Sequence, residues 1–112
     1  GFVAGEITKN RGIAICAPIA PYSATRSEIR RTIENYGGFT EVHVSTPLEI
    51  CEKRDRKGMY AKARAGLIQD FTGVDAPYET PQSPEVRIDT TAITPDEAAG
   101  QIMLYLQRQG FI

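Results

Sequence analysis

The spacing of apolar side chains near the start of the chain is that of α-helices. Val3 and Ile7 lie four residues apart in a segment that closes with Asn-Arg-Gly, a pattern typical of the last turns of a helix. Ile29 and Ile33 repeat this spacing in the next polar stretch, which runs to the paired glycines 37–38. The pattern therefore predicts two helices in the first third of the chain.

Three apolar or β-branched runs separate helix-like segments and predict strands. Residues 12–20 (GIAICAPIA) are continuously apolar between Gly12 and Pro21, as in a strand that is covered on both faces of a parallel sheet. Residues 39–46 (FTEVHVST) and 86–90 (VRIDT) are shorter strand candidates. Strands that alternate with helices predict a parallel sheet flanked by helices, with ligands beyond the carboxyl ends of the strands.

Three predicted helix starts carry a capping signal, in which a Thr precedes an acidic residue by three positions. One belongs to the second helix above, and the other two open further helices. The last of them opens a helix whose apolar face holds Ile102, Tyr105 and Leu106 and which ends at Gly110. The predicted caps are Thr25 with Glu28, Thr46 with Pro47 and Glu49, and Thr94 with Glu97.

Two segments between the second and third strands read as irregular. Residues 53–64 are dense in charge, which suits a mobile, solvated flap better than a core element. Residues 75–84 contain three prolines and predict an ordered loop. The predicted order is α, β, α, β, α, flap, β, α, so the positions to inspect for a ligand are 18–26, 46 onward and 90–93.

Composition narrows the function classes. The chain has 112 residues, 41% of them apolar and 24% charged, which fits one globular domain at most. A net charge of −1 provides no strong field for nucleic acid or an anionic membrane, and no apolar run approaches a bilayer span. Cys16 and Cys51 form no CxxC motif, so neither zinc nor a disulfide framework is implied and a reducing, cytoplasmic setting is expected.

Three stretches stand out together: PIAPY at 18–22 with Arg26 after it, RDRKGMYAKARAG at 54–66, and FTGVDAPYE at 71–79. In combination they resemble one enzyme family, adenylylsulfate (APS) kinase. The family's usual wording is an ISPY turn with a following Arg, an RDxKGLYxKARAG lid and an FTGIDxPYE loop. Order and spacing agree as well, and the resemblance covers essentially the whole chain.

The resemblance implies the fold and the activity. It implies a P-loop-NTPase-like, three-layer parallel α/β sheet, of which residues 1–112 form the C-terminal part of one domain, with a lid at about 53–70. The parent enzyme would transfer the γ-phosphate of ATP, taken with Mg²⁺, to the 3′-hydroxyl of APS. The product would be PAPS, as in sulfate assimilation.

The same resemblance implies a set of site residues. APS carries anionic groups and a planar adenine, so its site needs cations and an aromatic face, and base–aromatic stacking contributes roughly 1–3 kcal/mol. The substrate-binding positions are Ile19, Ala20, Lys57, Asp70 and Phe71, with Phe71 as the stacking ring and Asp70 contributing through its backbone. The ATP and lid positions are Arg54, Arg56, Lys62, Arg64, Thr90 and Ile93, with Arg54 expected to stack on the ATP adenine.

One element of such a kinase has no counterpart in these residues. The string GxxxxGK[ST], whose backbone cradles the ATP phosphates, does not occur here. We therefore assign no catalytic residue and no metal ligand, and we expect the isolated chain to be inactive. In the family the phosphate-loop strand lies between the strands matched by 12–20 and 39–46, so we expect self-association or a rearrangement that closes the gap.

Other interpretations stay open at this stage. The second is a catalytically dead APS-kinase-like module that binds APS or PAPS and regulates a fused sulfate adenylyltransferase. The CAPIAPY wording, with Ala20 in place of a family Ser, is associated with bacterial proteins that join the two enzymes. A third is another small-molecule kinase of the same fold, which the FTGVDAPYE loop disfavours. We also expect a homo-oligomer, and we expect His43 to be a core residue.

Overall fold

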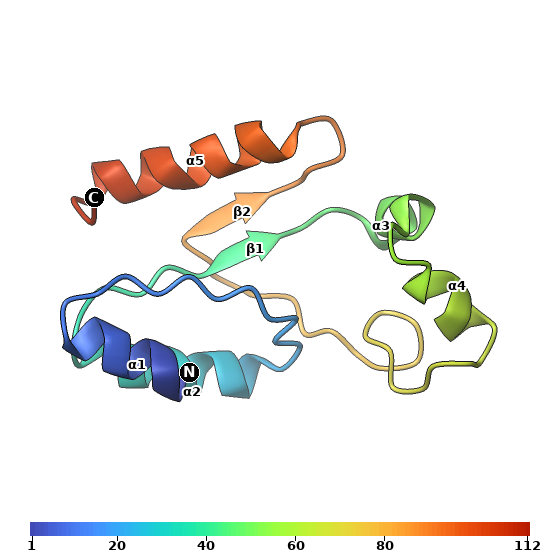
Figure 1. The fold of residues 1–112 in the computed structure, drawn as a ribbon, viewed down its shortest axis with the longest axis horizontal. Helices are drawn as coiled ribbons and strands as arrows, with labels where there is room; N and C mark the ends of the chain where they lie inside the picture. The colour runs from blue at the N-terminus through green and yellow to red at the C-terminus, as the bar shows by residue number, and fades with distance from the viewer.

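The computed structural model describes residues 1–112, and Figure 1 shows a small sheet between helices. Helix α5 lies on one side of the sheet, and the adjacent helices α1 and α2 lie on the other. The elements in chain order are α1 (Phe2–Lys9), α2 (Ser23–Glu34), β1 (Val42–Val44), α3 (Leu48–Arg54), α4 (Met59–Arg64), β2 (Val86–Ile88) and α5 (Pro95–Arg108).

The two strands form a parallel pair, as the alternation of strands and helices predicts. Val42 faces Val86 and Val44 faces Ile88 in the register, and the connection between the strands contains α3 and α4. Each strand is only three residues long, shorter than the predicted 39–46 and 86–90. Both arrowheads in Figure 1 point toward the end of the molecule that holds α3 and α4.

The predicted strand at 12–20 is wrong. These residues form neither helix nor strand, and the side chain of Ile15 is 94% exposed. A strand needs a backbone partner, and residues 12–20 pair with neither strand of the two-stranded sheet. The apolar run therefore passes beside the sheet as an extended segment without a cover of its own.

One predicted cap is confirmed in full. The Thr94 side chain accepts a hydrogen bond from the Glu97 amide, and the Glu97 carboxylate accepts one from the Thr94 amide at 2.7 Å. This reciprocal capping box, with Pro95 in the first turn, starts α5 where the sequence places it. All of its partners lie within three residues, which is why a local pattern finds it.

The other two predicted caps are wrong. Helix α2 begins at Ser23 rather than after Thr25, because the carboxylate of the distant Glu79 accepts the Ser23 amide at 2.6 Å. Helix α3 is preceded by Pro47 without a side-chain cap, and Thr46 uses its hydroxyl elsewhere. In both cases a partner from another part of the chain replaces the local one.

The core is small for a chain of this length. Only six of the 112 residues are buried, among them Ile33 on α2 and Ile88 on β2. His43 is buried too, as expected, with its ring stacked 6.1 Å from that of Tyr78. Desolvation, reinforced by nearby arginines, lowers the pKa of His43, so its neutral form fits the fold. Much apolar surface of the elements has no cover within these residues.

A charged cluster links α2 to the start of both strands. Arg30 donates two hydrogen bonds to the Glu85 carboxylate, at 2.6 and 2.7 Å, and its guanidinium lies over the Phe39 ring at 4.7 Å. Glu85 also accepts the Glu41 amide at 2.7 Å. The hydrogen bonds from Arg30 lower the pKa of Glu85 and raise that of Arg30. A bidentate, half-buried ion pair such as Arg30–Glu85 can hold a helix against strands even where few apolar side chains are buried between them.

We predict that Arg30→Met destabilises the fold by about 2 kcal/mol, because it leaves the half-buried Glu85 without its cation. The pKa of Glu85 is lowered in the folded state, so the pair stabilises above pH 4.5, the ordinary pKa of Glu. That stabilisation is lost as the pH falls through the lowered value. Urea unfolding at neutral and acidic pH measures both effects. Arg31→Met, on the exposed neighbour, is the control; equal stability of the two variants would contradict the prediction.

A second prediction concerns the uncovered segment. We expect this chain to self-associate, because residues 12–20 expose isoleucines beside a strand that is paired on one side only. Ile15→Asp should shift the population toward monomer in light scattering, whereas Thr25→Asp, on the exposed surface of α2, should not. A wild-type chain that stays monomeric, with rapidly exchanging amides at 12–20, would rule out both self-association and a closing rearrangement.

Candidate functional site

The carboxyl ends of the two strands are joined by a pair of threonines. The hydroxyls of Thr46 and Thr90 lie 2.6 Å apart, and the Thr90 amide donates to Thr46 Oγ1 at 3.0 Å. Thr46 follows β1 and Thr90 follows β2, so this contact fixes where the chain leaves each strand. The loops that leave here carry most of the predicted site residues.

Arg54, the last residue of α3, connects that helix to this point. Its Nη1 donates to Thr90 Oγ1 at 2.8 Å, and its Nη2 donates to the Thr90 carbonyl at 2.7 Å. The sequence-based assignment placed both residues on the ATP side, and the fold brings them into contact. Ile93, assigned to the same group, is half-buried in the loop before α5 and shares none of these hydrogen bonds.

Asp55 organises the turn between α3 and α4, a role that the sequence analysis missed. Its two carboxylate oxygens accept the amides of Tyr60 and Ala61, each at 3.0 Å, at the start of α4. Gly58 allows the turn between them, with φ of +64°. The predicted irregular flap therefore contains a helix of six residues. An Asp shortly before Gly and a helix-forming run was the available signal.

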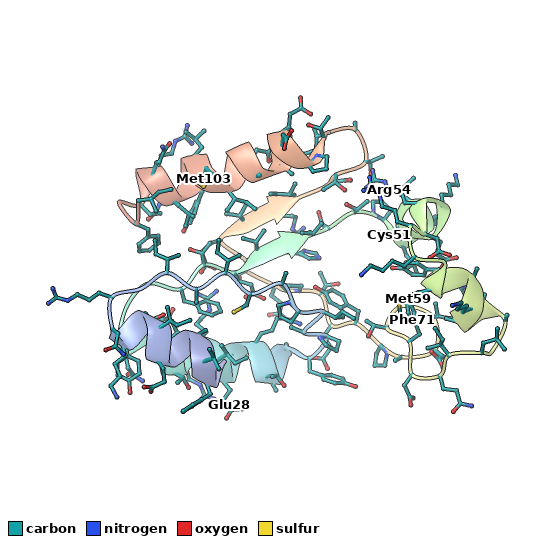
Figure 2. All side chains as sticks on the ribbon, viewed as in Figure 1. Glu28, Cys51, Arg54, Met59, Phe71 and Met103 are labelled. Atoms are coloured by element: carbon teal, nitrogen blue, oxygen red, sulfur yellow. The ribbon has the colours of Figure 1, made fainter.

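A hollow of about 340 Å³ opens between α3, α4 and the loop after them. Figure 2 shows Cys51, Arg54, Met59 and Phe71 gathered at this end of the molecule, with Met103 and Glu28 far from it. The Tyr60 ring meets the Phe71 ring edge-on, with centroids 5.1 Å apart. The lining residues are Cys51, Arg54, Asp55, Arg56, Lys57, Met59, Tyr60 and Phe71.

Asp75 shapes the loop that presents Phe71. Its carboxylate accepts the Phe71 amide at 2.6 Å and the Asp70 amide at 2.9 Å. Asp70 has a φ of +54°, a conformation that non-glycine residues seldom adopt. The Phe71 carbonyl in turn accepts amides from residues 74–76. The loop is thus a closed turn around Phe71, and Asp75 is a second residue that the sequence analysis did not single out.

Seven of the eleven predicted residues do not line this hollow: Ile19, Ala20, Lys62, Arg64, Asp70, Thr90 and Ile93. Ile19 is 68% exposed in the turn before α2, and the Ala20 carbonyl there accepts a hydrogen bond from Arg26 at 2.6 Å. Arg64 pairs with Glu52 across α3 and α4, and Lys62 is exposed. The fold therefore separates the predicted set into a group around Phe71 and outlying positions.

The hollow favours an anionic, planar ligand. Arg54, Arg56 and Lys57 bring three positive charges to its wall against the single carboxylate of Asp55, which is already engaged. The Phe71 ring supplies an apolar, aromatic surface beside them. Desolvation raises the pKa of Tyr60, which keeps its phenol neutral at physiological pH. Cations next to an aromatic ring suit a nucleotide.

Magnesium does not fit the residues of this chain. No group of three or more His, Cys, Asp or Glu side chains could hold a metal ion. Asp55, which lines the hollow, and Asp75, in the loop of Phe71, each accept backbone amides with their carboxylates. We therefore derive no step through a metal here. In addition, no helix of this chain combines the length and apolar character that a bilayer crossing requires.

Curated relatives cover nearly all of this chain but extend far beyond it. The chain is 51% identical over 111 residues to a sulfate adenylyltransferase of Phaeosphaeria nodorum and 49% identical to one of Neurospora crassa. These matches cover 99% of this chain and 19% of each relative. The chain thus spans about a fifth of the length of these relatives.

Solved structures give the same picture. The APS kinase CysC of Mycobacterium tuberculosis, in complex with AMPPNP and APS, aligns with a TM-score of 0.81 and 39% identity over 86% of this chain and 56% of that one. A hexameric APS kinase from Thiobacillus denitrificans aligns with a TM-score of 0.69 and 44% identity. The alignment covers 99% of this chain and 17% of that one. The family profile described as adenylylsulphate kinase matches residues 1–89. On this evidence, the chain belongs to the adenylylsulphate kinase family, with the P-loop NTPase type of fold in partial form.

Proposed function

We propose that this chain supplies the lid and part of the substrate site of a kinase domain that converts APS and ATP to PAPS and ADP. The observation that carries the proposal is the hollow in which the Phe71 ring lies beside Arg54, Arg56 and Lys57. The known complex of a family member with AMPPNP and APS supports both substrates. In this proposal residues 1–112 are the C-terminal part of one domain, with the lid at 53–70.

On the APS side, Phe71 would stack on the adenine and Lys57 would pair with the anionic groups. Asp70, whose amide is already directed to Asp75, would contribute through its backbone. Ile19 and Ala20 would complete this side from the turn before α2. Stacking of the adenine leaves the ribose hydroxyls free, so APS held by Phe71 can present its ribose 3′-hydroxyl to ATP.

On the ATP side, Arg54 would exchange its contact with Thr90 for the face of the ATP adenine. Thr90 and Ile93 would border that base from the loop after β2. The remaining lid cations, Arg56, Lys62 and Arg64, would neutralise charge on the transferred phosphoryl group and exclude water when the lid closes. The parent enzyme would take ATP with Mg²⁺, whose protein ligands would come from outside these residues.

The wider setting is part of the proposal. Curated relatives of about five times this length are named sulfate adenylyltransferase, which supports a fused adenylyltransferase domain in the complete polypeptide. A hexameric relative supports a homo-oligomer. The requirement for ATP and the two free cysteines, Cys16 and Cys51, fit a cytoplasmic enzyme.

A second candidate is a binding module that senses APS or PAPS and regulates the fused adenylyltransferase. The names of the fungal relatives favour it, because they give the adenylyltransferase activity. The intact cluster of Lys57, Phe71 and the lid arginines favours the kinase. The two candidates differ in whether PAPS is formed or only bound.

The complete polypeptide should form PAPS from ATP and APS, measured by chromatography, whereas the 112-residue chain should bind APS without turnover. Binding of APS or PAPS that changes the adenylyltransferase rate, without any PAPS formation, would establish the regulatory candidate instead. PAPS formation by the 112-residue chain would show that another element replaces the phosphate loop.

We predict that Phe71→Leu raises the KM for APS about tenfold or more in the complete polypeptide, because stacking contributes roughly 1–3 kcal/mol. The KM for ATP should stay unchanged. Phe71→Trp keeps an aromatic face and should retain most of the affinity, which separates stacking from loop anchoring. Equal effects of the two substitutions would mean that Phe71 only fills space.

Asp75→Ala should raise the KM for APS as well, through the loop rather than through contact. The substitution removes the acceptor of the Phe71 and Asp70 amides, so amide exchange at 70–76 should accelerate. Asp96→Ala, on the exposed first turn of α5, is the matched control. Faster exchange with an unchanged KM would show that the closed turn is not needed for APS.

A further inference from the structure

Each nitrogen of the Arg26 guanidinium group lies close to an oxygen of another residue. It lies in the first turn of α2 with only 11% of its side chain exposed. Its Nη1 donates to the Ala20 carbonyl and its Nη2 donates to the Glu79 carbonyl, both at 2.6 Å. Its Nε lies 3.0 Å from a carboxylate oxygen of Glu41. All three nitrogens of the guanidinium group therefore face a fixed oxygen.

Two of these oxygens belong to loops that are far apart in sequence. Ala20 lies in the PIAPY turn, and Glu79 ends the FTGVDAPYE loop that begins at Phe71. The loops also touch directly, since the Glu79 amide donates to the Pro21 carbonyl at 2.8 Å. The Glu79 carboxylate accepts the Ser23 amide at 2.6 Å, and the Arg26 guanidinium lies 5.8 Å from the Tyr78 ring centre. Arg26 is the side chain at the centre of this junction.

The third oxygen belongs to the carboxylate of Glu41 and lies next to the Arg26 Nε. Glu41 precedes β1, and its other carboxylate oxygen lies 3.4 Å from Arg30. Its oxygen toward Arg26 is buried and forms an ion pair without a well-aligned hydrogen bond. The Glu41 backbone is fixed by its amide's hydrogen bond to Glu85. The charge that holds Arg26 thus comes from the strand side of the molecule.

Ala20, whose carbonyl accepts the hydrogen bond from Arg26, has an unfavourable backbone conformation. Its φ is +44°, in the left-handed region that alanine seldom adopts, so the turn requires support from its surroundings. The hydrogen bond from Arg26 to the Ala20 carbonyl is that support. A lysine could not replace it, because one ammonium lacks the planar fork that reaches three separate acceptors.

We propose that Arg26 is a positioning residue for the APS side of the site. It fixes the backbone of Ile19 and Ala20 relative to the loop that carries Phe71, and it contacts neither the hollow nor a substrate itself. The inference rests on the proposed function, in which both loops bind APS. It assigns Arg26 a role that differs from that of Arg30, one turn later on the same helix.

The test compares Arg26→Lys with Arg30→Lys in the complete polypeptide. Both substitutions keep the charge, and both remove a guanidinium that pairs with Glu41. Arg30, however, reaches Glu85 and Glu34 instead of the substrate loops. We expect Arg26→Lys to raise the KM for APS at least tenfold with little change in the KM for ATP. Arg30→Lys should lower the unfolding midpoint and leave the KM for APS unchanged.

Amide hydrogen exchange provides a second readout that does not depend on turnover. In Arg26→Lys, protection should fall together at 18–22 and 77–82, whereas in Arg30→Lys it should fall at the start of the strands. Arg26→Gln, which keeps a donor but not the charge, replaces the lysine variant if that variant does not fold. An unchanged KM for APS, or loss of protection in only one loop, would overturn the proposal.

The same measurements separate this inference from the proposed function. A wild-type polypeptide that neither binds nor converts APS would overturn the function and, with it, the assignment of Arg26 to an APS site. A wild type that uses APS normally, with Arg26→Lys behaving like Arg30→Lys, would overturn the inference alone.

Discussion

The carboxylate of Glu41, held between Arg26 and Arg30, is the contact on which the arrangement of this chain depends. Its second oxygen lies near Arg30, and the Glu41 amide donates to Glu85, the bidentate partner of Arg30, so α2 is joined to the beginnings of β1 and β2. Through Arg26 it fixes the PIAPY turn and the end of the FTGVDAPYE loop. One acidic residue before a three-residue strand therefore connects the frame of the fold to loops of the site.

Charged contacts contribute strongly to the arrangement of this chain because few of its apolar side chains are buried. With six buried residues, the chain excludes little surface from water, and side chains such as Ile15 remain exposed. Partly buried, bidentate arginine pairs are directional, so they can define an orientation that a small core leaves loose. The apolar segment at 12–20 stays uncovered. Burying its isoleucines would increase the free energy of unfolding.

The candidate site lies at the other end of the strands and uses the same principle. Thr46, Thr90 and Arg54 join the two strand ends to the lid, and Asp55 and Asp75 each hold two backbone amides. Because these carboxylates are engaged, the positive charge of Arg56 and Lys57 at the hollow remains available to an anion. The geometry thus suits phosphoryl transfer chemistry in which the protein positions groups and neutralises charge.

The sequence by itself determined what depends on neighbours within a few residues. The capping box of Thr94, the parallel order of strands and helices and the motif around Phe71 could all be predicted, because their partners or patterns are local. Only the tertiary structure decided that residues 12–20 form no strand and that Ser23, not Thr25, starts α2. These outcomes depend on a missing strand partner and on Glu79, which lies 56 residues from Ser23. No local pattern contains that contact, because it forms only when the loops meet in space.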